Sequence, residues 1–245
     1  MAHEPRQPHA SPVTLTLLRG EPHPCAYLPD RFAAEAILPA IVQTGSAYQR
    51  LMDLGFRRTG AAFYRPACPA CEECRPIRVP VERFRLSRSQ RRVLRRNHDV
   101  EVDLSVPRAD DEHWALFQRY QIRQHDGAML GTRDQFERFL CDSPLPTIEI
   151  AYRLGGRLVG VGIVDVCPAS LSSVYMYFDP DDARRSLGVF SALCEIDECR
   201  RRGLPYWYIG YWVRGSRKMD YKRWFRPHEL LGPDGVWREA QSEVT

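Results

Sequence analysis

A predicted β-hairpin in the second half of the sequence restricts the fold more than any other feature. Two apolar runs, Thr147–Arg153 and Arg157–Val166, are separated by Leu154-Gly155-Gly156. Two strand-like runs joined by a short glycine turn are typical of an antiparallel hairpin. A third strand is expected over Ser172–Phe178, which ends at Asp179-Pro180. This part of the chain therefore predicts three successive strands of a sheet.

An amphipathic helix and another strand follow these three strands. Apolar residues at helical spacing cover Leu187–Arg202, which is followed by Gly203, and a strand is expected over Tyr206–Tyr211. Hairpin, strand, polar turn, helix and strand in this order resemble the acyltransferase fold of the N-acetyltransferase type. We therefore expect an α+β protein with a mixed sheet flanked by helices.

The first half of the sequence contains a looser version of this order, so we expect a duplicated N-acetyltransferase-like (acyltransferase) architecture. The expected N-terminal half covers residues 13–108, with a cysteine-rich connection and a basic helix, and the C-terminal acyltransferase-like half covers residues 109–240. A chain of 245 residues is long enough for one large domain or two compact halves. The other expected elements are helices over Thr44–Leu54, 87–97 and Arg133–Leu140, a helix containing Trp114, Phe117 and Tyr120, and strands over Phe56–Tyr64, Pro76–Phe84 and Val100–Val106.

Local patterns describe three of these elements more closely. Gly55 is a plausible C-terminal cap for the helix that precedes it. Ser87 is expected to cap the basic helix, because a serine hydroxyl can accept a hydrogen bond from the first turn. In Val100–Val106, apolar residues alternate with Glu101 and Asp103, which is the period of a half-buried strand.

Basic residues are concentrated in two stretches, although the formal net charge is only +4. Residues 83–96 contain seven arginines and no acid, and residues 200–226 contain nine basic residues and one acid, Asp220. Such clusters raise the local potential of a surface, and for the first stretch we favour RNA contact over a merely solvated helix face. The expected tRNA-binding residues are Arg88, Arg91, Arg92, Arg95, Lys218, Tyr221 and Lys222.

Aromatic residues are interleaved with the cations of residues 210–229. Cations neutralise phosphates, and flat side chains such as Trp212, Tyr221 and Trp224 can stack on unpaired bases or a terminal adenosine. The alternative is a solvated edge whose aromatic residues belong to the core, and composition alone does not decide between the two.

The eight cysteines occur in a chain without an apparent export signal, which disfavours disulfides. Cys68, Cys71 and Cys74 have the close spacing of thiolate ligands, and Cys25 could complete a set of four for structural zinc or an iron–sulfur cluster. No second CxxC or histidine pair follows. Ordinary small buried side chains are expected at Cys141, Cys167, Cys194 and Cys199.

Nothing in the sequence predicts export or a membrane partner. Met1–Pro12 is polar and proline-rich without an apolar signal-peptide core, so we expect a loose leader. No apolar stretch approaches the length of a membrane span. A cytoplasmic location is therefore expected.

Long motifs from about Tyr27 to Glu229 carry a family resemblance. They are Tyr27-Leu-Pro, Gly55–Pro66, Cys68–Arg78, Ser87–Arg92, Phe178–Gly188, Leu204–Ile209 and Gly210–Glu229, the last with Gly-Tyr-Trp, Lys-Met-x-Tyr-Lys and Phe-x-Pro. The chain resembles the arginyltransferase family of aminoacyl-tRNA–protein transferases, and within it the bacterial branch of aspartate/glutamate leucyltransferases. The eukaryotic branch has a Cys-Gly-Tyr-Cys box, whereas Cys25-Ala-Tyr-Leu28 lacks the second cysteine.

The resemblance implies transfer of leucine from leucyl-tRNA to the N-terminus of proteins that begin with Asp or Glu, which marks them for degradation in the N-degron pathway. The acceptor α-amine attacks the ester carbonyl, a peptide bond forms, and the 3′-terminal ribose hydroxyl leaves. Because the ester is already activated, the enzyme needs to position an uncharged amine, stabilise an oxyanion and exclude water. No covalent intermediate and no cofactor are required.

The acyltransferase fold implies a place for this reaction, where two central strands separate. That place is the end of the strand Val174–Phe178 and the start of the following helix. Asp179 is a candidate for helping to deprotonate the amine, and Tyr177 for a hydrogen bond to the oxyanion or the leaving hydroxyl. The alternatives are a turn aspartate before Pro180 and a core tyrosine.

An acidic acceptor side chain needs a cation, and arginine can bind a carboxylate with two parallel hydrogen bonds. Candidates from the cysteine-rich connection are Arg65, Arg75 and Arg78. Arg184 and Arg185 are further candidates, but near a helix N-terminus they could hold a phosphate instead. The sequence does not choose between these residues.

Two other functions are possible from the same sequence. An acetyl-CoA-dependent N-acetyltransferase would carry a turn of the type Arg/Gln-x-x-Gly-x-Gly/Ala before its long helix, whereas Arg184–Val189 contains one glycine. A non-catalytic RNA-binding module with a metal knuckle would not need the acyltransferase pattern of the second half. Both features favour the transferase.

Overall fold

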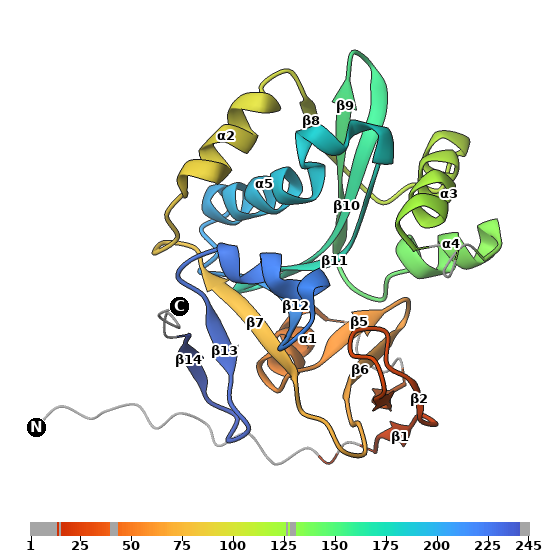
Figure 1. Ribbon diagram of the computed structural model, residues 1–245, viewed down its shortest axis with the longest axis vertical. Helices are drawn as coiled ribbons and strands as arrows, with labels where there is room; N and C mark the ends of the chain where they lie inside the picture. The colour runs from red at the N-terminus through yellow and green to blue at the C-terminus, as the bar shows by residue number, and fades with distance from the viewer. Residues whose placement is uncertain (1–13, 15, 40–43, 126, 128–130, 241–245) are drawn as a thin grey trace, which may run out of the picture.

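The computed structural model describes residues 14, 16–39, 44–125, 127 and 131–240, and the expected leader Met1–Pro12 lies outside these residues. An eight-stranded mixed sheet with the strand order β14-β13-β7-β12-β11-β10-β9-β8 runs through the molecule (Figure 1). A smaller sheet has the order β1-β4-β6-β5. None of the described helices is long and apolar enough to cross a membrane.

The bounds of the elements are as follows. The large sheet contains β7 (Cys74–Pro80), β8 (Glu101–Ser105), β9 (Thr147–Leu154), β10 (Arg157–Cys167), β11 (Ser170–Phe178), β12 (Tyr206–Val213), β13 (Glu229–Leu231) and β14 (Trp237–Glu239). The smaller sheet contains β1 (Leu18–Arg19), β4 (Glu35–Leu38), β5 (Arg57–Thr59) and β6 (Ala62–Pro66), and β2 (His23–Pro24) pairs with β3 (Phe32–Ala33). The helices are α1 (Gly45–Asp53), α2 (Arg88–Arg96), α3 (Asp111–His125), α4 (Arg133–Leu140) and α5 (Leu187–Arg201), with 3-10 helices η1 (Pro180–Arg185) and η2 (Arg217–Trp224).

The hairpin predicted from the sequence lies in the large sheet between β11 and the edge strand β8. β9 and β10 pair antiparallel across Gly155 and Gly156, whose φ angles of 55° and 82° are the left-handed values that a tight hairpin turn requires. β11 pairs antiparallel with β10, and α5 then carries the chain back so that β12 lies parallel to β11. The expected fold class, an α+β acyltransferase-like architecture with a mixed sheet flanked by helices, is confirmed.

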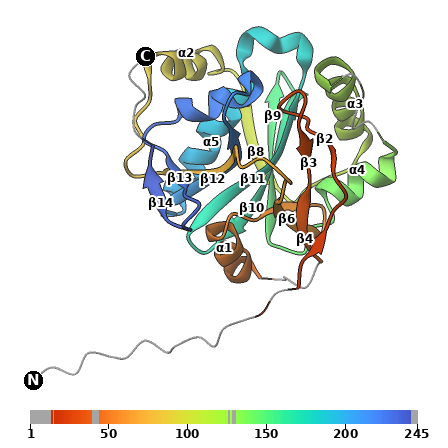
Figure 2. The ribbon, with the colours of Figure 1, turned by 60° about the horizontal axis from the view of Figure 1, so that its bottom comes forward.

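Helices cover both faces of this sheet (Figures 1 and 2). On one face, Phe190 and Ile196 of α5 belong to the same buried cluster as Val159 of β10. On the other face, Phe117 of α3 and Phe136 of α4 pack with their rings 4.8 Å apart against the sheet. Burial of large apolar side chains on both faces stabilises the layers.

The expected helix caps are present. Ser87 Oγ accepts a hydrogen bond from Gln90 N at 3.2 Å, and Gln90 Oε1 accepts one from Ser87 N at 2.8 Å, which is a capping box at the start of α2. α4 begins after Thr132 with the same arrangement. Gly55 follows α1 with a φ of 85°. These polar groups satisfy backbone donors that helix ends leave without partners.

Three expectations about strands were wrong in detail. Residues 56–64 form a hairpin of β5 and β6 around Gly60, with a φ of 52°, instead of one strand. β7 ends at Pro80, and a turn replaces the rest of the expected strand. β8 lies at the edge of the sheet, where Leu104 and Val106 are 38% and 74% exposed. An edge strand is not covered over its full length, so the alternation in its sequence does not match burial.

The large sheet takes strands from both expected halves. β7 and β8 precede residue 109, whereas β9–β14 follow it. The smaller sheet belongs entirely to the first half. Division of the chain at residues 108 and 109 remains a prediction, and hydrogen bonding between β8 and β9 continues the sheet across that border.

A buried ion pair joins the smaller sheet to the large one. Arg58 of β5 donates from Nε and Nη2 to the two carboxylate oxygens of Asp165 on β10, both at 2.8 Å, and both side chains are 0% exposed. Arg58 Nη1 also donates to Gly60 O at 2.6 Å, and Thr147 Oγ1 donates to Asp165 Oδ1 at 2.7 Å. The pair is therefore bidentate and supported on both sides, the geometry in which a buried ion pair is tolerated.

We expect Arg58→Met to lower the free energy of unfolding by about 3–5 kcal/mol, because it leaves the Asp165 carboxylate buried without its cation. Urea denaturation followed by circular dichroism measures this loss. The double variant Arg58→Met/Asp165→Leu should recover much of it, because no charge is then buried. A loss below about 1 kcal/mol in the single variant would show that the pair does not join the two sheets energetically.

Candidate active site

The two central strands of the large sheet separate soon after they meet. β11 and β12 are paired at only three positions, Ser170 with Tyr206, Leu171 with Trp207, and Ser172 with Tyr208. Both strands then continue, β11 to Phe178 and β12 to Val213. We call the parts in which these two strands no longer pair with each other, Ser173–Phe178 and Ile209–Val213, the β11/β12 fork.

Local irregularities in both strands accompany the fork. The register of β11 against β10 shifts between the pairs Ile163–Tyr175 and Val164–Ser173, so that Val174 is an extra residue. The register of β12 against β7 shifts between Tyr208 and Tyr211, and Gly210 within this shift has a φ of 91°. Such bulges bend a strand and increase its twist. The sequence therefore turns both strands away from each other at the same level.

Two cations replace the hydrogen bonds that the strands lose at the fork. Arg57 of β5 donates from Nη2 to Ser173 O at 2.7 Å, and Lys222 of η2 donates from Nζ to Tyr211 O at 2.8 Å. A buried carbonyl needs such a partner. Arg57 and Lys222 are themselves only 6% and 8% exposed. Both positive charges are thus held in the interior, next to the separating strands.

Lys222 is a lysine that titrates near neutral pH. Burial, and to a smaller extent repulsion by Arg57, lowers its pKa from 10.5 to about 7, and Cys74 opposes this change. Gly210 gives the ammonium room, since a Cβ at this position would lie 3.3 Å from Lys222 Nζ. A pKa near 7 makes a substantial fraction of neutral amine available at neutral pH, which is the property of a general base.

Glu195 of α5 adds a buried carboxyl group at the base of the fork. It accepts hydrogen bonds from Trp207 Nε1 at 2.8 Å and Ser191 Oγ at 3.3 Å, and also from Ser173 Oγ. Burial raises the pKa of Glu195, and the three hydrogen bonds oppose that shift. These bonds fix Ser173, whose carbonyl receives Arg57, from the side of α5.

Tyrosines with partly accessible rings surround the fork. Tyr27 is 40% exposed, while Tyr64, Tyr175 and Tyr221 are half-buried. Burial, with smaller contributions from Tyr64 and Cys74, raises the pKa of Tyr27 to about 12, so these groups lie near one another. Burial likewise raises the pKa of Tyr221 to about 12, with Glu195 contributing. Neutral aromatic rings of this kind provide faces on which a base can stack.

The two residues predicted to be catalytic make structural contacts. Asp179 is 2% exposed and forms ion pairs with Arg119, at 3.1 Å, and with Arg157. Its Oδ1 also accepts a hydrogen bond from Asp181 N, so that Asp179 caps the start of η1. Tyr177 is 0% exposed and lies in the cluster formed with α3 and α4. The contacts are those of the turn aspartate and core tyrosine considered as alternatives, and the catalytic roles stay predictions.

The arginines predicted to bind an acidic side chain differ in how far they are already engaged. Arg75 donates to Leu231 O at 2.8 Å. Arg78 pairs with Glu229 at 2.8 Å and with Asp53 at 3.3 Å. Arg65 is exposed and lies 5.0 Å over the Phe56 ring.

Arg184 and Arg185 lie together at the end of η1. Arg184 is exposed, and its carbonyl accepts from Arg96. Arg185 pairs with Asp99 at 2.8 Å. The structure therefore does not bring the predicted arginines together at one point.

The predicted tRNA-binding residues divide into exposed and buried ones. Lys218 is exposed, Tyr221 is half-buried, and Lys222 is buried in the fork. Lys222 is one of the expected tRNA-binding residues, but its ammonium is bonded to Tyr211 O inside the protein, and a contact with tRNA stays a prediction. The four predicted arginines of α2 are exposed and form no ion pair with the described residues. They are Arg88, Arg91, Arg92 and Arg95.

The four cysteines proposed as metal ligands are half-buried and influence one another. Burial and the other three thiols raise the pKa of Cys74 to about 12, so this sulfur is a neutral thiol as arranged. In the parts of the chain that the structure describes, no group of three or more His, Cys, Asp or Glu side chains is arranged to hold a metal ion. The metal site stays a prediction. Of the other four, Cys167 and Cys199 are buried, and Cys141 and Cys194 are half-buried.

Sequence reasoning missed the cations of the fork. Arg57 belongs to the motif Gly55–Pro66 without a role of its own in the sequence analysis, and the basic stretch around Lys222 predicts tRNA binding instead. Glu195 was one of several acids on an amphipathic helix. A signal was present only for Gly210, since a glycine within an aromatic strand indicates a bulge or a close approach.

We expect the free energy of unfolding to rise by about 1 kcal/mol from about pH 7.5 to about pH 8.5 in the wild type relative to Lys222→Met. The folded pKa of Lys222 lies below the unfolded one, so the unfolded chain binds more protons in this range. Chemical denaturation at several pH values measures the free energy of unfolding of both proteins. The contributions of cysteines and tyrosines cancel in the difference, because both proteins contain the same ones. Parallel curves for the two proteins would contradict the lowered pKa.

Comparisons with known proteins agree with the motifs. Family models described as "Arginine-tRNA-protein transferase, N terminus" and "C terminus" match residues 23–92 and 112–232. An aspartate/glutamate leucyltransferase of Hahella chejuensis is 40% identical over 90% of this chain and 96% of its own. One of Stenotrophomonas maltophilia is 42% identical over 94% and 95%. The solved structures include a domain of a putative lysylphosphatidylglycerol synthetase from Agrobacterium fabrum, which aligns with a TM-score of 0.47 and 15% identity. The alignment covers 69% of this chain and 52% of that one, and the similarity is too distant to indicate function. The chain belongs to the arginine-tRNA-protein transferase family, among relatives that are aspartate/glutamate leucyltransferases.

Proposed function

We propose that the protein is an aminoacyl-tRNA–protein transferase that moves leucine from leucyl-tRNA to the α-amine of proteins beginning with Asp or Glu. The observation that carries this proposal is the similarity to relatives described as aspartate/glutamate leucyltransferase, 40–43% identical over at least 86% of this chain and 91% of theirs. The family models name arginine instead. Leucine follows from the full-length relatives.

The same proposal defines the partners. They are leucyl-tRNA and acceptor proteins with an acidic N-terminal residue, whose modification marks them for degradation in the N-degron pathway. We place this reaction in the cytoplasm, where charged tRNA is available. The exposed arginines of α2 and the exposed Lys218 supply positive charge for the tRNA backbone.

Lys222 supports the chemical step at the fork. Its neutral amine takes a proton from the acceptor α-amine as the nitrogen attacks the ester carbonyl carbon. The C–N bond forms, the bond between the carbonyl carbon and the ribose 3′ oxygen breaks, and the lysine returns the proton to that oxygen. The pKa of an α-amine is about 8 and that of Lys222 is about 7, so the transfer between them is nearly balanced.

Arg57 is the cation best placed for an acidic acceptor residue. It is the arginine that lies close enough to Lys222 to lower the pKa of that lysine, although, like Arg75, it already donates to a backbone carbonyl. A carboxylate held by Arg57 would bring the α-amine of the same residue to Lys222. Arg65 and Arg184, which are exposed, remain candidates from the earlier set.

We expect the purified protein to add leucine to a peptide that begins with Asp, and not to the same peptide beginning with Arg. Mass spectrometry after incubation with mixed aminoacyl-tRNAs measures this. A mass gain of arginine on the acidic peptide would refute leucine, and no gain on either peptide would refute the transferase. A clear rise in the melting temperature with acetyl-CoA would favour the acetyltransferase alternative instead.

We expect Lys222→Met and Lys222→Arg to lower kcat by about 10²–10⁴-fold, because neither side chain can accept a proton. Arginine retains a donor for Tyr211 O, so recovery of activity in Lys222→Arg would show that Lys222 only supports this carbonyl. Lys218→Met, a change of the exposed lysine in the same segment, should raise KM for leucyl-tRNA and leave kcat similar. Steady-state kinetics measure kcat and KM for all three variants. Their melting temperatures should be close to that of the wild type, which shows that they are folded.

A further inference from the structure

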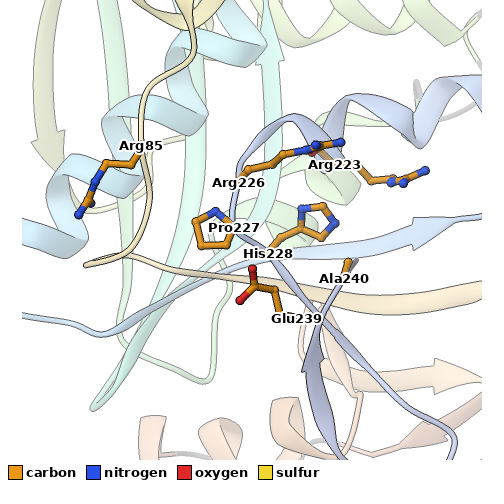
Figure 3. A pocket seen from close by; sticks show the side chains of 7 residues that line it. All are labelled: Arg85, Arg223, Arg226, Pro227, His228, Glu239 and Ala240. Carbon is orange, nitrogen blue, oxygen red and sulfur yellow. The ribbon is translucent and has the colours of Figure 1, made fainter. Parts of the chain in front are cut away.

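A basic pocket lies apart from the fork, beside the start of α2 (Figure 3). It has a volume of about 280 Å³ and lies between the linker that precedes α2 and the loop that connects η2 to β13. Its lining residues are Arg85, Arg223, Arg226, Pro227, His228, Glu239 and Ala240.

Hydrogen bonds and ring contacts hold the two walls of the pocket together. Arg85 N donates to Arg226 O at 3.2 Å. Gln90 Nε2 of α2 donates to Trp224 O at 3.1 Å. The rings of Phe84 and Phe225 lie 6.3 Å apart between these bonds. The shape of the pocket is therefore fixed by the backbone and by buried side chains.

Three guanidinium groups and one carboxylate line the pocket. The carboxylate, Glu239, forms an ion pair with Arg83, which is not a lining residue. Within the described part of the chain, neither Arg85 nor Arg226 forms an ion pair, and both are exposed. Arg223 lies 5.0 Å over the Trp212 ring. Arg85 and Arg226 thus bring positive charge to the pocket that no acidic side chain of the described residues pairs with.

His228 is a buried polar side chain at this pocket. It is 4% exposed, and neither of its ring nitrogens makes a hydrogen bond of normal geometry with the described residues. Most buried polar atoms are hydrogen-bonded, so two such atoms on one ring require an explanation. Figure 3 shows the ring on the side of the pocket where Arg223 and Arg226 lie.

The imidazole is neutral as it stands. Burial, with smaller contributions from Arg223 and Arg226, lowers the pKa of His228 to about 4, and the Phe225 backbone and Glu239 oppose the shift. A neutral imidazole offers one N–H donor. The donor and the neighbouring guanidinium groups are complementary to an anion with several acceptor oxygens.

We propose that this pocket binds a phosphoryl group, and that in function it is a backbone phosphate of the tRNA substrate. Arg85 precedes the cap of α2 by two residues, so the exposed arginines Arg88 and Arg91 continue the basic surface away from the pocket. A single inorganic phosphate would not need this continuation, whereas a phosphodiester chain would follow it. The assignment to tRNA rests on the proposed transferase function.

The pocket would also orient the tRNA relative to the fork. Arg223 lines the pocket, and the adjacent Lys222 enters the fork. A phosphate bound at Arg223 and Arg226 is thus held on the segment that supplies the proposed base. This contact positions the nucleic acid and carries no sequence information by itself.

The test measures binding of uncharged tRNA to the full chain at several salt concentrations. We expect Arg226→Gln and Arg85→Gln each to weaken binding about tenfold and to reduce the slope of log K against log salt by about one. Arg50→Gln is the matched control, because Arg50 is an exposed arginine on α1, away from α2 (Figure 2). Unchanged affinity and slope in both pocket variants, with melting temperatures near that of the wild type, would overturn the proposal.

Nuclear magnetic resonance of labelled histidine separates the two sources of phosphate. We expect tRNA to shift the His228 ring signals and to raise the pKa of His228 above its free value, because an anion favours the charged ring. Saturation by inorganic phosphate, without any effect of tRNA, would overturn the RNA assignment. No response to either would overturn the site.

Failure of the transferase proposal would give a different result. In that case no leucine reaches an Asp-initiated peptide even in the wild type. The tRNA affinities of the pocket variants would still be measurable, because they do not depend on transfer.

Discussion

The early separation of β11 from β12 is the constraint on which the rest of the structure depends. Three residue pairs hold these parallel strands together, and beyond Ser172 the backbone groups need other hydrogen-bond partners. A buried carbonyl without a partner costs about 1–3 kcal/mol. Arg57 and Lys222 supply the partners from two distant segments, β5 and η2. The smaller sheet and the C-terminal basic stretch are therefore required for the central sheet to remain open.

Filling this fork with two cations determines its chemistry. Two apolar side chains could occupy the space but could not bond to Ser173 O and Tyr211 O. Two cations in a poorly solvated place repel each other. Lysine is the group that can become neutral, so burial and, to a smaller extent, repulsion by Arg57 lower the pKa of Lys222. The arrangement that stabilises the backbone thus also produces an amine that exchanges protons near pH 7.

The sequence predicted those features whose signals are local. Gly155 and Gly156 indicate a hairpin, and Ser87 indicates a helix start, because each depends on residues within one turn. The fork could not be predicted in the same way. Arg57 reaches Ser173 across 116 positions of sequence, and burial of Lys222 depends on where η2 lies on β12. The basic neighbours of Lys222 in the sequence favour an exposed position, and tertiary packing overrides that preference.

The short segment η2 links the two basic regions of the molecule. Lys222 points into the fork, while Trp224 is 58% exposed. Phe225 is anchored against Trp207 at 5.1 Å, and Gln90 ties the Trp224 carbonyl to α2. A segment held on both sides cannot move independently of α2. Nucleic acid bound along the arginines of α2 is therefore held in a fixed position relative to Lys222, and positioning of this kind is what an already activated ester requires.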